Sequence, residues 1–140
     1  MFEIDESYTP NIIIKFKNTI ENDTEFTDFL NYWLNLYTKN KDFSLIFDTR
    51  EINKVPNIKY CFQMALFIYQ LKQQKHTYLQ KSAIIINDDK IKHLLNFIFA
   101  LQSPIADVYI YNSEDITDIY NIFEKFDDDE MTDYILIKSN

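Results

Sequence analysis

The chain has 140 residues, the length of one ordinary domain, and its composition of 46% hydrophobic and 26% charged residues is typical of a folded protein. It contains no glycine, which excludes a phosphate-binding loop, a dinucleotide-binding fingerprint and a G-x-S-x-G nucleophile elbow, because each needs glycine where the backbone turns sharply or approaches a ligand. The net charge is −8 and Arg50 is the only arginine, which argues against nucleic acid and anionic membranes as partners, because both are bound mainly through Lys and Arg.

The negative charge is concentrated towards the C-terminal end. Nine of the 22 acidic residues, but only one of the 14 basic residues, lie between Ser113 and Asp133. Asp127–Glu130 lacks the spaced ligands of a calcium loop and is typical of a solvated linker. We therefore expect an α/β domain over residues 1–126 and an acidic segment over residues 127–140 that ends in an extra strand.

The sequence favours neither an oxidising compartment nor a membrane. Cys61 is the only cysteine, so no internal disulfide can form. The first residues are acidic and lack the basic region and apolar run of a signal peptide. No apolar stretch approaches the roughly 20 residues that span a bilayer. We expect a cytoplasmic protein without membrane insertion.

The first third of the chain predicts strands on either side of a helix. Two strands are expected at residues 2–4 and 11–17, the second with an alternating apolar face. A helix begins near Thr24, after good capping residues, and its apolar side chains recur every three or four positions. A short strand follows at residues 43–47 and stops at Asp48.

The remaining chain alternates helices with strands. Helices are expected from Pro56 to Gln74, over 89–101 and over 114–126, and strands over 82–86, 108–111 and 134–138. Strands that alternate with helices of this length form parallel sheets. We predict a single α/β domain with a mixed, mainly parallel sheet of about five strands and four helices.

This order of elements resembles the STAS domain, which sulfate-transporter tails share with bacterial anti-sigma-factor antagonists. The likeness covers about residues 2–126 and rests on Phe43–Asp48, which ends in an acid, and on the loop and apolar helix that follow. It implies a regulatory protein-binding module, with partner contacts around Asn53, Asn57 and Lys59. In the antagonists a serine is phosphorylated at about the position of Asn57. Asn57 has no hydroxyl, so the resemblance implies no phosphorylation site here.

The helix after this loop has two apolar stripes, although a helix lying on a sheet needs only one. One stripe consists of Ile58, Cys61, Phe62, Ala65 and Tyr69. The other is nearly opposite and consists of Tyr60, Met64, Phe67 and Leu71. We expect the second stripe to be exposed and, with the preceding loop, to bind a protein partner or a second copy of the chain. The alternative is that neighbouring elements cover it.

No catalytic, cofactor-binding or metal-binding constellation stands out, and we expect the protein not to be an enzyme. Cys61, His76 and His93 are the only thiol and imidazole groups, and their spacing fits neither a zinc site nor a local nucleophile–base pair. Cys61 shares a helical face with apolar residues and is expected to be buried.

Two alternatives to a protein-binding role stay open at this point. Asp48, Asp88 and Asp89 follow predicted strands and could hold Mg²⁺ in a receiver-like or phosphotransfer site, although Asp88 or Asp89 is better explained as a helix cap. The 16% aromatic content is compatible with a carrier of an apolar ligand, which requires a cavity rather than a filled core.

Overall fold

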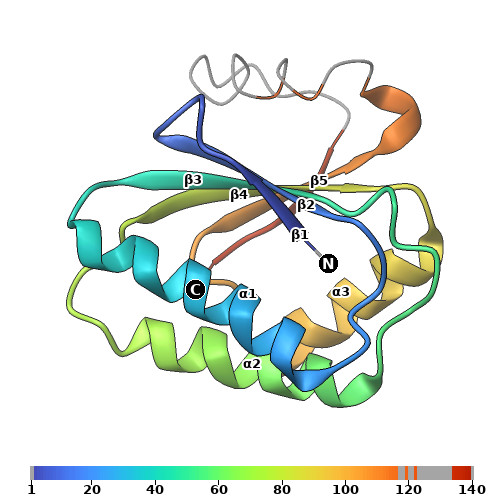
Figure 1. Cartoon of the computed structure of the whole chain (residues 1–140), viewed down its shortest axis with the longest axis horizontal. Helices are drawn as coiled ribbons and strands as arrows, with labels where there is room; N and C mark the ends of the chain where they lie inside the picture. Colours follow the sequence, from blue (N-terminus) through green and yellow to red (C-terminus); the bar gives the residue numbers. More distant parts are fainter. Residues whose placement is uncertain (1, 117–118, 120–121, 123–133, 140) are drawn as a thin grey trace.

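Six strands form one sheet and lie in it in the order in which they occur in the chain (Figure 1). The computed structural model describes residues 2–116, 119, 122 and 134–139. Strands β2 to β5 are parallel, whereas β1 and β6 pair antiparallel with β2 and β5 at the two edges. The strands are β1 Phe2–Asp5, β2 Asn11–Phe16, β3 Phe43–Asp48, β4 Leu79–Ile86, β5 Asp107–Asn112 and β6 Ile135–Ile137.

Three helices connect the parallel strands and lie on one face of the sheet (Figure 1). They are α1 Asp23–Leu36, α2 Ile58–Lys72 and α3 Asp89–Leu101, and short 3-10 turns follow α1 and β5 at Tyr37–Lys39 and Ser113–Asp115. Each connection steps to the next strand in the same direction, and such crossovers are almost always right-handed, so all three helices are placed on the same face. This order makes α2 the middle helix of the layer.

Polar side chains at the helix starts fix where the helices begin. The Asn22 side chain accepts a hydrogen bond from the Glu25 backbone N–H at 2.9 Å, and the Asp88 carboxylate accepts one from Lys90 N–H at 2.8 Å. Each satisfies a backbone donor that the first helical turn leaves without a partner. The expectation that Asp88 or Asp89 caps the third helix is confirmed.

The main core fills the space between the sheet and the helices and is rich in aromatic rings. The Trp33 ring lies 5.5 Å from Phe47 of β3, 5.3 Å from Phe67 of α2 and 6.0 Å from Phe29, measured between ring centroids. A smaller cluster lies on the other face of the sheet, where Ile46 and the other inward residues of that face are covered by the described residues of 116–122 and by Tyr134. Both faces of β3 are therefore buried along its whole length.

The structure confirms the α/β class, the single domain and the mixed, mainly parallel sheet, and within the described residues it corrects the number of strands. The sheet has six strands rather than about five, because β6 joins its edge. The predicted helix over 114–126 lies largely outside the described residues, and its described start is the 3-10 turn at Ser113–Asp115, so three α-helices are described instead of four. The strand expected at 134–138 is β6. Part of the predicted C-terminal segment thus belongs to the sheet.

No helix within the described residues has the length and apolar character needed to cross a membrane.

Two element boundaries differ from those expected. The helix expected from Pro56 begins at Ile58, with Asn57 as its N-cap. The strand expected at 82–86 begins earlier, at Leu79.

Replacing Trp33 with alanine is expected to reduce the free energy of unfolding by about 3–5 kcal/mol, because it removes a buried ring that joins α1, β3 and α2. Urea denaturation measures the change. The matched control is Leu34→Ala, since Leu34 is the next residue on α1 but is 42% exposed. Equal losses in the two variants would contradict the packing of α1 described above.

Candidate functional site

The outer surface of the helix layer carries a group of exposed large apolar side chains. Four of them lie on α2 and two on α3, and we call this set the α2–α3 face: Ile58, Phe62, Leu66, Tyr69, Phe97 and Leu101. Their exposed fractions run from 37% for Phe97 to 60% for Ile58. The Phe62 and Phe97 rings meet edge to face with centroids 5.6 Å apart, so the apolar surface continues from one helix to the other.

The stripe of α2 that was expected to face outwards is buried. Tyr60, Phe67 and Leu71 are each less than a tenth exposed, and Met64 is half-buried. Neighbouring elements cover them, as the alternative interpretation required: Phe67 packs on Trp33, and Tyr60 packs on Phe26 at 4.9 Å. The predicted orientation of α2 is therefore wrong, and Tyr60, Phe67 and Leu71 are not available to a partner in this fold.

Contacts with both neighbouring helices fix the rotation of α2. On the α1 side the Tyr60 hydroxyl donates a hydrogen bond to Asp23 Oδ1 at 3.0 Å. Burial, and then this hydrogen bond, raise the pKa of Tyr60 above its usual value. On the α3 side Cys61 and Ile68 pack with Ile98. The remaining side of α2, which carries the exposed residues of the α2–α3 face, points away from the core.

Two of the three residues that the STAS resemblance singles out, Asn57 and Lys59, have local contacts at the start of α2. Asn53, Asn57 and Lys59 are all exposed. The Asn57 side chain caps α2 by accepting a hydrogen bond from Lys59 N–H at 2.9 Å. Lys59 Nζ pairs with Asp23 Oδ1 at 3.0 Å, and the hydrogen bond and charge of Asp23 raise the Lys59 pKa. Asn57 and Lys59 are the chain neighbours of Ile58, at one end of the α2–α3 face.

The two helices that carry the α2–α3 face are richer in lysine than in acidic residues, although the chain has a net negative charge. Helices α2 and α3 contain four lysines and one acidic residue, whereas the whole chain has 22 acidic and 14 basic residues. Helix α2 itself contains no acidic residue. The two helices that carry this face therefore hold more cationic than anionic side chains, although the chain as a whole is negative.

Asp48 at the end of β3 is bound by the only arginine rather than left open for a metal. Its carboxylate is almost fully buried and accepts hydrogen bonds from Arg50 Nε at 2.9 Å and Arg50 Nη2 at 2.8 Å, one on each oxygen. Burial alone raises the Asp48 pKa, but the hydrogen bonds and charge of Arg50 outweigh burial and hold it below the usual value. Bidentate pairing of this kind is among the strongest polar contacts in proteins.

The structure does not support the magnesium site. Asp88 is occupied as the cap of α3, and Asp48 by Arg50. Among the described residues, no group of three or more His, Cys, Asp or Glu side chains is arranged to hold a metal ion.

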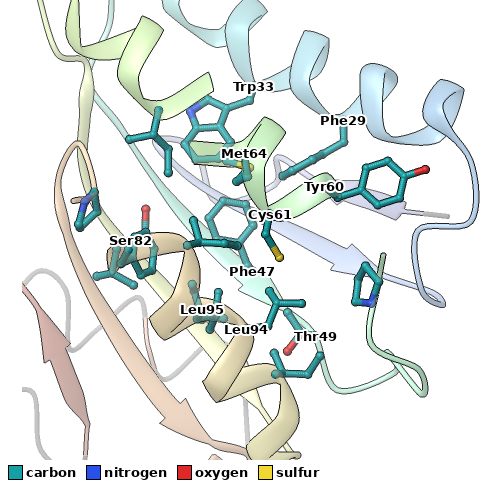
Figure 2. A pocket seen from close by; sticks show the side chains of 18 of the residues that line it. Phe29, Trp33, Phe47, Thr49, Tyr60, Cys61, Met64, Ser82, Leu94 and Leu95 are labelled. Atoms are coloured by element: carbon teal, nitrogen blue, oxygen red, sulfur yellow. The ribbon is translucent and has the colours of Figure 1, made fainter. Parts of the chain in front are cut away.

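An apolar cavity lies between the helices and the sheet, beneath the α2–α3 face (Figure 2). Its volume is about 160 Å³, and it is lined by side chains of all three helices and of strands β2 to β5. Figure 2 labels these residues of the lining: Phe29, Trp33, Phe47, Thr49, Tyr60, Cys61, Met64, Ser82, Leu94 and Leu95. The space is partly open to solvent and lies where α2 and α3 meet the sheet.

Cys61 is buried, as expected, and lines this cavity. Burial raises the pKa of its thiol, which keeps the group protonated and poorly nucleophilic at neutral pH.

Comparisons with protein-family models, with curated proteins and with solved structures found no match. The resemblance to STAS domains consequently stays a prediction from the sequence.

Replacing Arg50 with methionine is expected to lower the free energy of unfolding at pH 7 by roughly 2 kcal/mol, because it removes both guanidinium donors and the positive charge from a buried carboxylate and leaves it the backbone N–H of residue 50. The Asp48 pKa in the folded state lies below the usual 3.8, so this stabilisation is present above pH 3.8 and is lost as the pH falls through the folded value. The difference in the free energy of unfolding between the wild-type protein and the variant should therefore become smaller in acid. Urea denaturation between pH 7 and pH 3 measures it.

The matched control is Lys15→Met, which removes a neighbouring cation that pairs with the exposed Glu51 at 3.1 Å. Such surface pairs contribute less than about 1 kcal/mol. If the difference in the free energy of unfolding between the wild-type protein and Arg50→Met does not change with pH, Arg50 does not stabilise the Asp48 charge. The same follows if the control variant loses as much stability as Arg50→Met.

Proposed function

We propose that this protein is a non-catalytic protein-binding module and that its α2–α3 face binds an amphipathic helix of another protein. The observation that carries the proposal is the exposure of six large apolar side chains on two neighbouring helices. Extended apolar patches on folded proteins mark interaction sites, and aromatic residues are enriched at interface centres. Phe62, Tyr69 and Phe97 supply the aromatic part of this patch.

The geometry of the two helices supports a helical partner. Helices α2 and α3 both follow parallel strands and run side by side in one layer. A partner helix can lay its apolar stripe along such a pair and contact it at every third or fourth residue. The edge-to-face contact of Phe62 with Phe97 marks the line along which the two helices meet.

Charge favours a different protein over a second copy as the occupant. The lysines of α2 and α3 outnumber their acidic residues by four to one. In a symmetric dimer through this face, the lysines of one copy would lie near the lysines of the other, and their repulsion would weaken the dimer. A partner helix with acidic residues beside its apolar stripe is complementary. Asn53, Asn57 and Lys59, at the Ile58 end of the face, are proposed to form part of its polar rim.

This proposal keeps the function class implied by the STAS resemblance but moves the main contact surface. Protein binding stays the proposed role, with no catalytic residue, cofactor or metal proposed. The apolar anchors are the exposed residues of α2 and α3 instead of the buried stripe.

A synthetic amphipathic peptide with a Leu/Phe stripe flanked by glutamates is the probe for this proposal. We expect it to bind about tenfold more tightly than the same peptide flanked by lysines, and the difference should shrink with added salt. Fluorescence anisotropy measures the affinities. The double variant Phe62→Ser, Leu66→Ser should weaken binding of the acidic peptide by tenfold or more, because it removes two central anchors.

Leu34→Ser is the control, since Leu34 is exposed to a similar degree but lies on α1. Sedimentation of the protein alone over a range of concentrations tests the second-copy alternative. Equal affinities for the two peptides, or a dimer that Phe62→Ser, Leu66→Ser dissociates, would overturn the proposed occupant.

A further inference from the structure

The cavity beneath α2 and α3 is too large to be an ordinary packing defect. Protein interiors are close-packed, and the few voids that they contain are about the size of a water molecule. A water molecule needs roughly 10–15 Å³ of such space, whereas this cavity measures about 160 Å³. Cavities of similar volume lined by Leu, Ile and Phe bind benzene in other proteins.

The lining offers little that could hold water. The Thr49 hydroxyl donates its hydrogen bond to the Ile85 carbonyl at 2.6 Å. The Tyr60 hydroxyl points away from the cavity and donates to Asp23 (Figure 2). Since an ordered water needs two to four polar partners, the space is better suited to an apolar guest.

We propose that this cavity is a binding site for a small neutral aromatic molecule of about the size of benzene or toluene. The side chains around it supply the contacts that aromatic rings prefer. Phe29, Trp33 and Phe47 form part of its wall and already meet one another in tilted or edge-to-face geometry, with centroids 5.5–6.1 Å apart. Cys61 and Met64 add sulfur atoms, which make favourable contacts with ring edges. A guest ring would extend this cluster.

The guest can enter from the helix side without separation of the strands. Met64 of α2 and Leu94 and Leu95 of α3 line the cavity, which is partly open to solvent, and their partial exposure places them at its solvent side. Met64 is unbranched and has several rotatable bonds, which lets it move aside at low energetic cost. The site is distinct from the α2–α3 face, and the proposal does not depend on the protein partner.

Titration with toluene, followed by NMR of the methyl groups, tests the proposal. We expect saturable binding with a dissociation constant on the order of 1 mM. Intermolecular NOEs should connect toluene to the methyl groups of Met64, Leu94 and Leu95. Methylcyclohexane, which has a similar size but no aromatic ring, should bind severalfold more weakly.

Substitutions that fill the cavity separate interior binding from surface binding. Cys61→Leu adds apolar volume to the lining and should weaken toluene binding by tenfold or more, with Ala106→Val as a second filling variant if the first fails to fold. Leu34→Ser, outside the cavity, should leave the affinity unchanged. Folded filling variants that bind toluene as tightly as the wild-type protein would overturn the proposal, as would NOEs to Leu66 and Leu101 in place of those to Met64 and Leu94. Equal affinity for methylcyclohexane would overturn the aromatic preference.

Discussion

The order of the parallel strands determines most of what distinguishes this molecule. Because β2 to β5 follow one another across the sheet in chain order, every crossover helix lies on the same face, and α2 is held between α1 and α3. The middle helix buries the side that faces the sheet and the two sides that face its neighbours. Only its outer side remains, and there the chain places Ile58, Phe62, Leu66 and Tyr69. These four apolar side chains lie exposed beside polar residues such as Gln63 and Gln70, and their exposure is the physical basis of the proposed protein-binding role.

The cavity has its origin in the same layer. Well-packed cores alternate large and small side chains so that the layers interdigitate. Here the helix–sheet interface is built largely from rings and branched side chains, in a chain that has no glycine at all. Rigid rings such as Trp33, Phe29 and Phe47 support one another but do not fill the remaining space beside Cys61 and Met64. The bulky composition thus explains both a strong aromatic core and the space left within it.

The sequence predicted the elements well and the orientation of one helix badly. Periodicity and capping residues located α3 at Asp89–Leu101, and of the two expected caps, Asp88 and Asp89, the structure has Asp88. In α2 both stripes are apolar, so periodicity could not decide which one faces inwards. That choice depends on long-range contacts, such as Phe67 with Trp33 and Tyr60 with Asp23, which local sequence does not contain. The pairing of Asp48 with Arg50 joins residues only two positions apart, yet the sequence alone left Asp48 open as a metal ligand.

The orientation of α2 is the central structural claim, and solvent accessibility of its leucines measures it most directly. A soluble paramagnetic gadolinium chelate broadens NMR signals of methyl groups in proportion to their closeness to solvent. The structure predicts strong broadening for Leu66, which is 56% exposed, and protection for Leu71, which lies five residues further on and is 3% exposed. Protection of Leu66 together with broadening of Leu71 would contradict the fold of the helix layer and with it the proposed binding face.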